Sequence, residues 1–183
     1  DEPVLIANAK INTDIDIQSV FELHRARGCA VSMVLLPNPS RIPVREVLVE
    51  GERVVGFGEG DLPRGPRPYL FAGVHIVEPE VVRTIPIRFC DTVRDIYPAF
   101  IERGRVGADI RPSVAWREFS TPERYLSLHL EAAACGLGPS VACSQGALID
   151  DDARAVRSVV WEGARVERGA VVAFTVAGLH PHD

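Results

Sequence analysis

The sequence predicts an α/β fold that ends in a short β-helix, and two patterns in its 183 residues carry this prediction. The first is a pair of continuous apolar runs near the N-terminus with a helix-like segment between them, which indicates a strand, a helix and a second strand. The second is a six-residue spacing of valines and small residues in the last third of the chain. That spacing fits neither an α-helix nor a flat strand, and it is typical of a β-helix.

The first apolar run, Val4–Ala7, is continuous rather than alternating, which is typical of a strand that is buried on both faces. Asp16 is a favourable cap for the helix that follows, and Gly28 is a favoured residue just past its end. The second run, Cys29–Leu36, is again continuous and apolar. A strand, a helix and a strand in this order predict a parallel pair joined by a right-handed crossover.

The middle of the chain predicts a hairpin and then a long strand. Two short apolar runs, Val44–Val49 and Arg53–Phe57, are separated by Glu50-Gly51-Glu52, as in a β-hairpin. A loop rich in Pro, Gly and Arg leads to the strand Tyr69–Val77, which contains Gly73. A glycine inside a strand often marks a bulge or a close approach of ligand or backbone.

The segments after this strand predict two short helices, a strand and a longer helix. Ser120 and Glu123 have the spacing of a capping box, and Pro122 suits the first turn of the longer helix. The expected ranges are Glu78–Ile85 and Thr92–Arg103 for the short helices, Val114–Phe119 for the strand, and the residues from Ser120 to Gly136 for the longer helix.

The six-residue spacing begins after Gly136. It joins Val160, Val166 and Val172, and likewise Ser158, Ala164 and Ala170. The segment has room for about two coils, whereas about three are needed for independent stability. We therefore expect an α/β domain over residues 1–137 and a hexapeptide-type β-helix stub with a tail over residues 138–183, leaning on the main domain or on a partner. The alternative is two ordinary hairpins with this spacing by chance.

The composition excludes several classes of protein. A net charge of −5 and a pI of about 5.6 give no bulk attraction to nucleic acid or to an anionic membrane. No apolar run approaches the roughly 18 residues that cross a bilayer, and no signal peptide is visible. The four cysteines have no CxxC spacing, so neither a disulfide framework nor a zinc site is expected, and a cytoplasmic location is the default.

Five segments, taken in order, resemble the sugar-phosphate nucleotidyltransferases (NDP-sugar pyrophosphorylases), and mannose-1-phosphate guanylyltransferase-like members look closest. They are "VLIANAKINTDIDIQSVFELHRARGCAVSMVLL", "RVVGFGEG", "YLFAGVHIVEPEVV", "WREFSTPERYL" and the tail with six-residue spacing. The resemblance implies a doubly wound, mostly parallel sheet followed by a left-handed β-helix. It also implies transfer of a nucleotidyl group from an NTP to a sugar 1-phosphate, with release of pyrophosphate and with Mg²⁺ as the cofactor.

The resemblance further implies that the family's N-terminal nucleotide-binding loop is missing. "GFGEG" at 56–60 follows a hairpin strand and enters no helix, so it does not replace that loop. Because the chain opens on Asp1 almost directly before a core-type strand, we expect it to be a piece of a longer protein. The expected ligands are a sugar 1-phosphate with an NTP, or an NDP-sugar, and β-helix stubs of this family suggest a homo-oligomer.

The resemblance assigns sugar- or phosphate-binding roles to four residues. The family strand that ends in Asn-x-Asp supplies a metal-binding aspartate; here it ends in Asn8-Ala9-Lys10, so Lys10 occupies the aspartate's position. Gly73, in the Ala-Gly of the sugar-facing strand, is the cleanest match. Glu59 matches the first residue of the family's Glu-Lys-Pro motif, but Gly60 and Asp61 follow it, so the motif's lysine is absent.

The second metal ligand that the resemblance implies falls on Glu118. The family motif Asp-x-Gly-Thr-Pro appears here as Glu118-Phe119-Ser120-Thr121-Pro122. Its extra methylene moves the carboxylate by about one bond length, whereas Mg²⁺ demands near-ideal geometry. No catalytic residue is assigned, because the matches to the family's motifs at positions 10, 60 and 118 are poor.

Each of these residues also has a plain structural interpretation. Lys10, the only lysine, either neutralises phosphate in place of a metal ion or is simply solvated. Glu118 is either a remnant metal ligand or a support for the helix after Ser120, and Glu59 is expected to be a solvated loop acid. Trp116 is expected in the core rather than in a base-stacking platform.

Two functions therefore remain open. The first is an enzyme, the sugar-binding part of a nucleotidyltransferase, with activity that requires the missing N-terminal segment. The second is a binding, regulatory or assembly subunit that keeps the fold without metal catalysis, and the residues at positions 10, 60 and 118 favour it.

Overall fold

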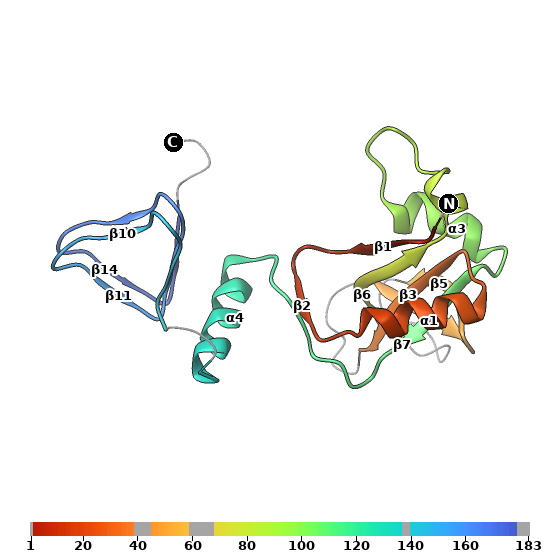
Figure 1. Cartoon of the computed structure of the whole chain (residues 1–183), viewed down its shortest axis with the longest axis horizontal. Coiled ribbons are helices and arrows are strands. Elements are labelled where there is room, and N and C mark those ends of the chain that lie inside the picture. The colour runs from red at the N-terminus through yellow and green to blue at the C-terminus, as the bar shows by residue number, and fades with distance from the viewer. Residues whose placement is uncertain (1, 39–44, 59–67, 137–139, 179–183) are drawn as a thin grey trace. The chain divides into compact units, whose positions relative to one another are not determined.

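A computed structural model describes residues 2–38, 45–58, 68–136 and 140–178 (Figure 1). The chain divides into two compact units, residues 1–116 and residues 117–183, and each is described here by itself. The domain division predicted after residue 137 stays a prediction.

The first unit contains most of the regular structure. Its strands are β1 (Val4–Ala7), β2 (Ile11–Thr13), β3 (Val31–Pro37), β4 (Glu46–Glu50), β5 (Arg53–Gly58), β6 (Pro68–Val77) and β7 (Val106–Ile110). Its helices are α1 (Ile17–Arg27), α2 (Pro79–Val82), the π-helix η1 (Thr92–Ile96) and α3 (Tyr97–Ile101), and β8 (Trp116–Glu118) begins at its end.

The strands form a mixed sheet in the order β1-β6-β3-β7-β5-β4. The first residues of β6 also pair with β4, so five strands, β3, β7, β5, β4 and β6, close into a barrel with β1 attached to β6. The β3–β7 pair is parallel, and the other pairs of this sheet are antiparallel. The unit is therefore α/β, but the expectation of a mostly parallel sheet is wrong.

The predicted parallel pairing of the first two strands is also wrong, because β6 lies between β1 and β3 and runs antiparallel to both. Within the described residues β1 has one neighbour only, and Val4 is 45% exposed, so this strand is not buried on both faces. An apolar run predicts a strand but does not show which strand lies beside it. The partner that is parallel to β3 is β7, whose run is interrupted by Gly107 and Asp109 and was not predicted.

Helix α1 begins and ends where the sequence predicts. The Asp16 carboxylate accepts a hydrogen bond from the backbone N–H of Gln18 at 3.0 Å, which satisfies one of the free donors of the first turn. Gly28 adopts a φ of +59° and its N–H bonds to the His24 carbonyl, which ends the helix. The hairpin of β4 and β5 is likewise confirmed, with its turn at Gly51 and Glu52.

The two short helices are shorter than predicted. The first is only the four residues of α2, and the second is divided into η1 and α3. Pro98 lies in the first turn of α3, where its missing N–H removes a helical hydrogen bond and accompanies the change from π to α geometry.

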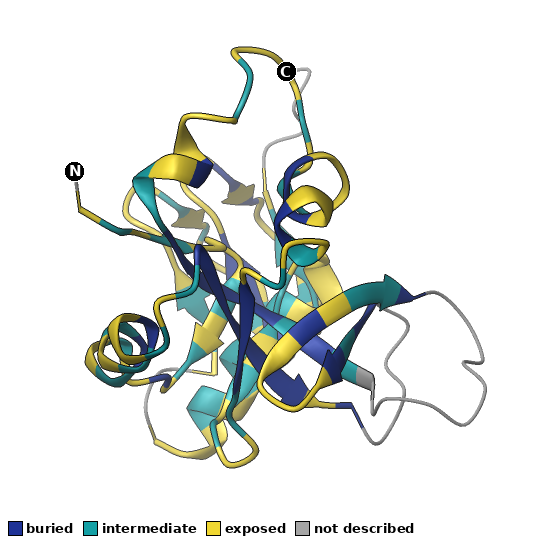
Figure 2. Cartoon of the chain, turned by 90° about the vertical axis from the view of Figure 1, so that its right-hand side faces the viewer, coloured by how far each residue is buried: buried dark blue, intermediate teal, exposed yellow. Residues whose placement is uncertain are grey.

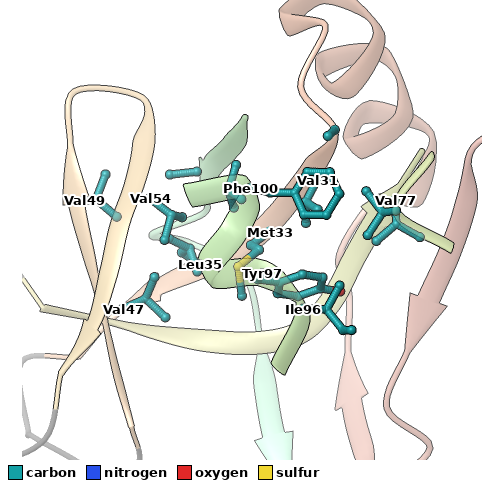
Figure 3. Packing of buried hydrophobic residues seen from close by; sticks show 14 residues of the cluster. Val31, Met33, Leu35, Val47, Val49, Val54, Val77, Ile96, Tyr97 and Phe100 are labelled. Carbon is teal, nitrogen blue, oxygen red and sulfur yellow. The ribbon is translucent and has the colours of Figure 1, made fainter. Parts of the chain in front are cut away.

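Two apolar clusters stabilise this unit, and β3 supplies side chains to both. Val31, Met33 and Leu35 pack with the α3 side chains Tyr97 and Phe100 (Figure 3). The alternate positions of β3 point to the other face and pack beneath α1, in a cluster formed by Ile15, Val20, Val34, Leu36, Leu70, Ala72, Val74 and Ile76. The sheet strands are largely buried and the loops exposed (Figure 2).

The helix of the second unit is α4 (Pro122–Ala134). Its N-cap is Thr121, whose hydroxyl accepts from the Arg124 N–H at 3.3 Å, so the predicted cap at Ser120 is wrong by one residue. Pro122 is in the first turn as expected, and Gly136, with a φ of +72°, follows the helix end.

Short strands follow α4, and the pairs that the structure describes among them are parallel. Partners such as Ala142 and Val159, or Leu148 and Arg165, lie 17 residues apart. Val160, Ala164 and Val166 form a small buried cluster at positions of the six-residue pattern. Parallel pairing does not fit the alternative of two ordinary hairpins, while the left-handed β-helix stays a prediction. The strands are β9 (Ala142–Cys143), β10 (Leu148–Ile149), β11 (Arg154–Val156), β12 (Val159–Val160), β13 (Arg165–Val166), β14 (Val171–Ala173) and β15 (Val176–Ala177).

Among the described segments, no helix combines the length and apolar character needed to span a membrane.

The Asp16 cap supports a first prediction. Asp16→Ala should lower the free energy of unfolding by about 1 kcal/mol, because an N–H of the first turn of α1 loses its acceptor. Asp16→Asn keeps an acceptor oxygen and is the matched control. Urea unfolding followed by circular dichroism measures both variants, and equal losses in the two would show that the cap contributes nothing.

Candidate functional site

Three strands of the first unit end at the same edge of the sheet. β1 and β3 run in one direction, because both are antiparallel to β6, and β7 is parallel to β3. Their carboxyl ends lead into Asn8 and Lys10 after β1, Asn38 after β3, and Arg111 after β7. Ligands of α/β sheets are usually held at this edge, so its polar residues form the candidate site.

The structure brings Asn8 and Gly73 together. The Asn8 N–H donates to the Gly73 carbonyl at 2.8 Å, just beyond the last pair of the β1–β6 ladder. A methyl group at position 73 would lie only 2.7 Å from Nδ2 of Asn8, so the Asn8 side chain lies directly against the glycine. These two residues were predicted from different segments of the sequence to belong to one site.

Gly73 is also the centre of the irregularity that the sequence predicts in this strand. Between Met33 and Leu35 on β3 the paired positions on β6 move from His75 to Phe71, which is a bulge on the β6 side. Gly73 has a φ of +78°, a conformation that side-chain-bearing residues rarely adopt. The glycine is therefore required both by its backbone conformation and by its contact with Asn8.

Trp116, at the C-terminal end of the first unit, contacts β6 next to Gly73. Its indole Nε1–H donates to the Ala72 carbonyl at 2.9 Å, and its ring packs against the apolar cluster beneath α1. The preceding residue, Ala115, donates its N–H to the Asp14 carboxylate at 2.7 Å and accepts from the Thr13 hydroxyl at 2.8 Å. Trp116 is thus a packing residue, as expected, and it fixes the backbone next to Gly73.

Lys10 is exposed in the turn between β1 and β2. No described residue forms a salt bridge or hydrogen bond with its ammonium group, so the charge is available to a ligand or to water. Glu59, with Gly60 and Asp61, lies outside the described residues.

Glu118 is a member of the second unit and already has partners there. Its carboxylate accepts from the Ser120 N–H at 2.8 Å and forms an ion pair with Arg124. Hydrogen bonding to Ser120 and the Arg124 guanidinium hold the pKa of Glu118 below its ordinary value. These contacts are the ones that a support for the start of α4 would make.

A polar group at the end of β7 was missed by sequence analysis. The Asp109 carboxylate is buried and accepts from Arg111 at both oxygens, at 2.7 and 2.8 Å, while Arg111 also donates to the Ser19 hydroxyl at 2.8 Å. Hydrogen bonding to Asp109 raises the pKa of the Arg111 guanidinium. The arrangement joins β7 to α1. The signal that could have revealed it is Asp-x-Arg at the end of an apolar run.

His75 was also missed as a special residue. It is 4% exposed and lies between the rings of Phe71 and Tyr97, with centroids 5.3 and 5.7 Å away. Within the described part of the chain neither ring nitrogen has a hydrogen-bond partner. Burial lowers the pKa of His75 from 6.5 to about 4, so the imidazole is neutral at physiological pH.

No family model matches the chain. Over 98% of its length it is 20% identical to mannose-1-phosphate guanylyltransferase 1 of Arabidopsis thaliana and 22% identical to probable mannose-1-phosphate guanylyltransferase 2 of the same plant. It is 19% identical to probable mannose-1-phosphate guanylyltransferase 2 of Oryza sativa subsp. japonica. The chain spans 58% of the length of each of these relatives. At this low identity the relatives support a sugar nucleotidyltransferase-like family.

The contact between Asn8 and Gly73 supports a second prediction. Gly73→Ala should lower the free energy of unfolding by about 1–3 kcal/mol, because the new methyl group combines an unfavourable φ with a collision against Asn8. Gly56→Ala is the control, since a methyl group there meets only Leu48, at an ordinary 3.7 Å.

The double variant Asn8→Ala, Gly73→Ala separates the effect of the collision with Asn8 from the effect of the unfavourable φ. It should be less destabilised than the sum of the single variants, because the collision is removed while the backbone strain remains. Strict additivity in urea unfolding would contradict the close contact.

The buried imidazole supports a third prediction, on pH. His75 binds its proton less tightly in the folded chain than in the unfolded chain. The stability that depends on the neutral imidazole is therefore complete above pH 6.5 and is lost as the pH falls toward 4. A shift of this size corresponds to about 3 kcal/mol. His75→Phe should remove this part of the pH dependence, measured as unfolding free energy at pH values across that range. An identical pH profile for variant and parent would contradict the assignment.

Proposed function

We propose that this chain forms the sugar-phosphate-binding part of a sugar-phosphate nucleotidyltransferase. In this reaction an oxygen of the sugar 1-phosphate attacks the α-phosphorus of a nucleoside triphosphate, a new P–O bond forms, and the bond to pyrophosphate breaks. Mannose 1-phosphate and GTP are the substrates suggested by the names of the relatives. Because the chain spans 58% of those relatives, the complete activity is assigned to the longer protein.

The observation that carries the proposal is the contact between Asn8 and Gly73. The resemblance assigned both residues to sugar or phosphate binding from separate motifs, and the N–H of one bonds to the carbonyl of the other. The left-handed φ and the missing side chain of Gly73 let the Asn8 side chain lie directly against the strand backbone. A glycine in a strand often marks such a close approach, and here it positions Asn8 at the carboxyl edge of the sheet.

Lys10 would supply the positive charge at this edge. It follows Asn8 by two residues and is exposed, so its ammonium can reach a phosphate bound beside the end of β1. An ammonium binds phosphate through charge-assisted hydrogen bonds, but as a single flexible charge without fixed geometry. Lys10 is therefore the cation that we assign to the phosphate of the sugar.

The described residues do not fit the Mg²⁺ that the resemblance implies. Mg²⁺ is usually held by carboxylates in near-octahedral geometry. Here a lysine occupies the position of one expected carboxylate, and Glu118 is engaged by Arg124 and Ser120. Nowhere in the described ranges do three or more His, Cys, Asp or Glu side chains gather as a metal site would need. We assign no step of the reaction to a metal ion held by these residues.

The poor fit of these residues to Mg²⁺ favours the second candidate, a sugar-nucleotide-binding or regulatory subunit that keeps the fold without catalysis. Nucleotidyl transfer depends on neutralising charge on the transferring phosphate, which divalent metal ions usually provide. A chain that binds the sugar phosphate through Lys10 but holds no metal would bind the product or the substrate without turnover. Homo-oligomerisation through the second unit, and a cytoplasmic location, remain predictions.

The fourth prediction tests binding and turnover together. GDP-mannose should bind the chain saturably by calorimetry, and Lys10→Ala should weaken binding at least about tenfold, the effect of losing one charge-assisted contact. Lys10→Arg should retain most of the affinity, and Arg25→Ala, at an exposed position late in α1, is the control.

Pyrophosphate release from GTP and mannose 1-phosphate, measured for the longer protein, then decides between the two candidates. Turnover supports the enzyme, and binding without turnover supports the non-catalytic subunit. Absence of both binding and turnover overturns the proposal.

A further inference from the structure

A polar cavity lies at the opposite edge of the sheet from Asn8 and Lys10. It has a volume of about 400 Å³ and is lined by residues that precede β3 and β7 and that follow β6. Its size falls within the usual range for small-molecule sites. The lining side chains that matter here are Cys29, Glu78, Glu80, Arg83 and Arg105.

The Glu78 carboxylate lines this cavity and forms a hydrogen bond with the buried imidazole of His24. Nε2 of His24 lies 3.1 Å from Oε1 of Glu78, and Nδ1 of His24 lies 2.8 Å from the Ser32 hydroxyl. A carboxylate only accepts, so Nε2 carries the proton toward Glu78, and in the neutral imidazole Nδ1 then accepts from the serine. His24 is 1% exposed, whereas the Glu78 side chain is 35% exposed and reaches the cavity.

This network engages one oxygen of Glu78, a residue that lines the cavity. No described residue forms a hydrogen bond with Oε2 of Glu78. The chain Ser32–His24–Glu78 is not a nucleophilic triad, because the serine hydroxyl is buried and bonded to the imidazole. Because His24 is buried and bonded to both Ser32 and Glu78, it holds Oε1 of Glu78 in place.

The rest of the cavity carries both signs of charge. Arg105 forms an ion pair with Glu80 at 2.8 Å, and both side chains stay about half exposed. Arg83 adds a second guanidinium to the lining. The lining side chains thus include two carboxylates and two guanidiniums. A simple anion or a simple cation would meet repulsion from half of the lining, whereas a ligand with both charges would match it.

We propose that this cavity binds a small zwitterion of the α-amino acid class. The ligand carboxylate bonds to the guanidiniums of Arg83 and Arg105, which present paired donors suited to carboxylates. Its ammonium bonds to the free oxygen of Glu78. The site is separate from the candidate sugar-phosphate site, and it does not depend on the proposed function.

The test uses L-glutamine as the probe and two compounds that each lack one of its charges. Glutaramate lacks the ammonium and 4-aminobutanamide lacks the carboxylate, while both keep the side-chain amide. Each is titrated into the ¹⁵N-labelled 183-residue chain, and the amide signals of Gly28, Cys29 and Arg83 are followed. We expect saturable shifts with glutamine at a Kd on the order of 1 mM, and binding at least about tenfold weaker for either analogue.

Variants give the second arm of the test. Glu78→Gln should weaken glutamine binding at least about tenfold, because the ammonium loses its charged partner. Arg88→Gln, an exposed position outside the cavity lining, should leave binding unchanged. The proposal is overturned if glutamine produces no saturable shifts, if glutaramate binds as well as glutamine, or if a folded Glu78→Gln variant binds normally.

Discussion

The hydrogen bond between Asn8 and Gly73 is the constraint on which the candidate site depends. It ends the pairing of β1 with β6 at the point where β6 bulges, and it brings the turn with Lys10 to the carboxyl edge of the sheet. A larger residue at position 73, or another backbone conformation there, would disturb this contact. Trp116 fixes the neighbouring carbonyl of Ala72, so the bulge is held from two directions.

The elements with local signals could be predicted from the sequence. Asp16 and Gly28 define α1 because capping depends on a few neighbouring residues. Gly73 predicted the bulge because a strand rarely contains glycine without a backbone reason. The contact between Asn8 and Gly73 was foreseen only as membership of one site, through the resemblance of two separate segments.

The elements that depend on long-range pairing could not be predicted. The run Val4–Ala7 is apolar whether its neighbour is parallel or antiparallel, so the place of β6 beside it is invisible locally. The carboxylate of Asp109 interrupts β7 in the sequence, but its ion pair with Arg111 makes burial possible. His24 and Ser32 lie on different elements, and only the fold brings them together behind Glu78.

The charges of Lys10 and Glu118 distinguish the two candidate functions more clearly than the fold of the chain does. The positions expected to hold a metal present an exposed ammonium at Lys10 and a carboxylate of Glu118 already bound to Arg124. The Lys10 ammonium can neutralise a phosphate, but these two side chains together lack the geometry that Mg²⁺ requires. The relatives support a sugar nucleotidyltransferase-like family, whereas these side chains do not match a metal-dependent transfer.

The dependence of GDP-mannose binding on divalent metal tests this account most directly. Titrations of the chain in Mg²⁺ and in EDTA, at matched ionic strength, compare a site built on Lys10 with one built on a metal ion. The account predicts the same Kd in both solutions. A Kd that is at least about tenfold lower in Mg²⁺, with the difference abolished by Glu118→Gln, would show a metal ion in the site and contradict it.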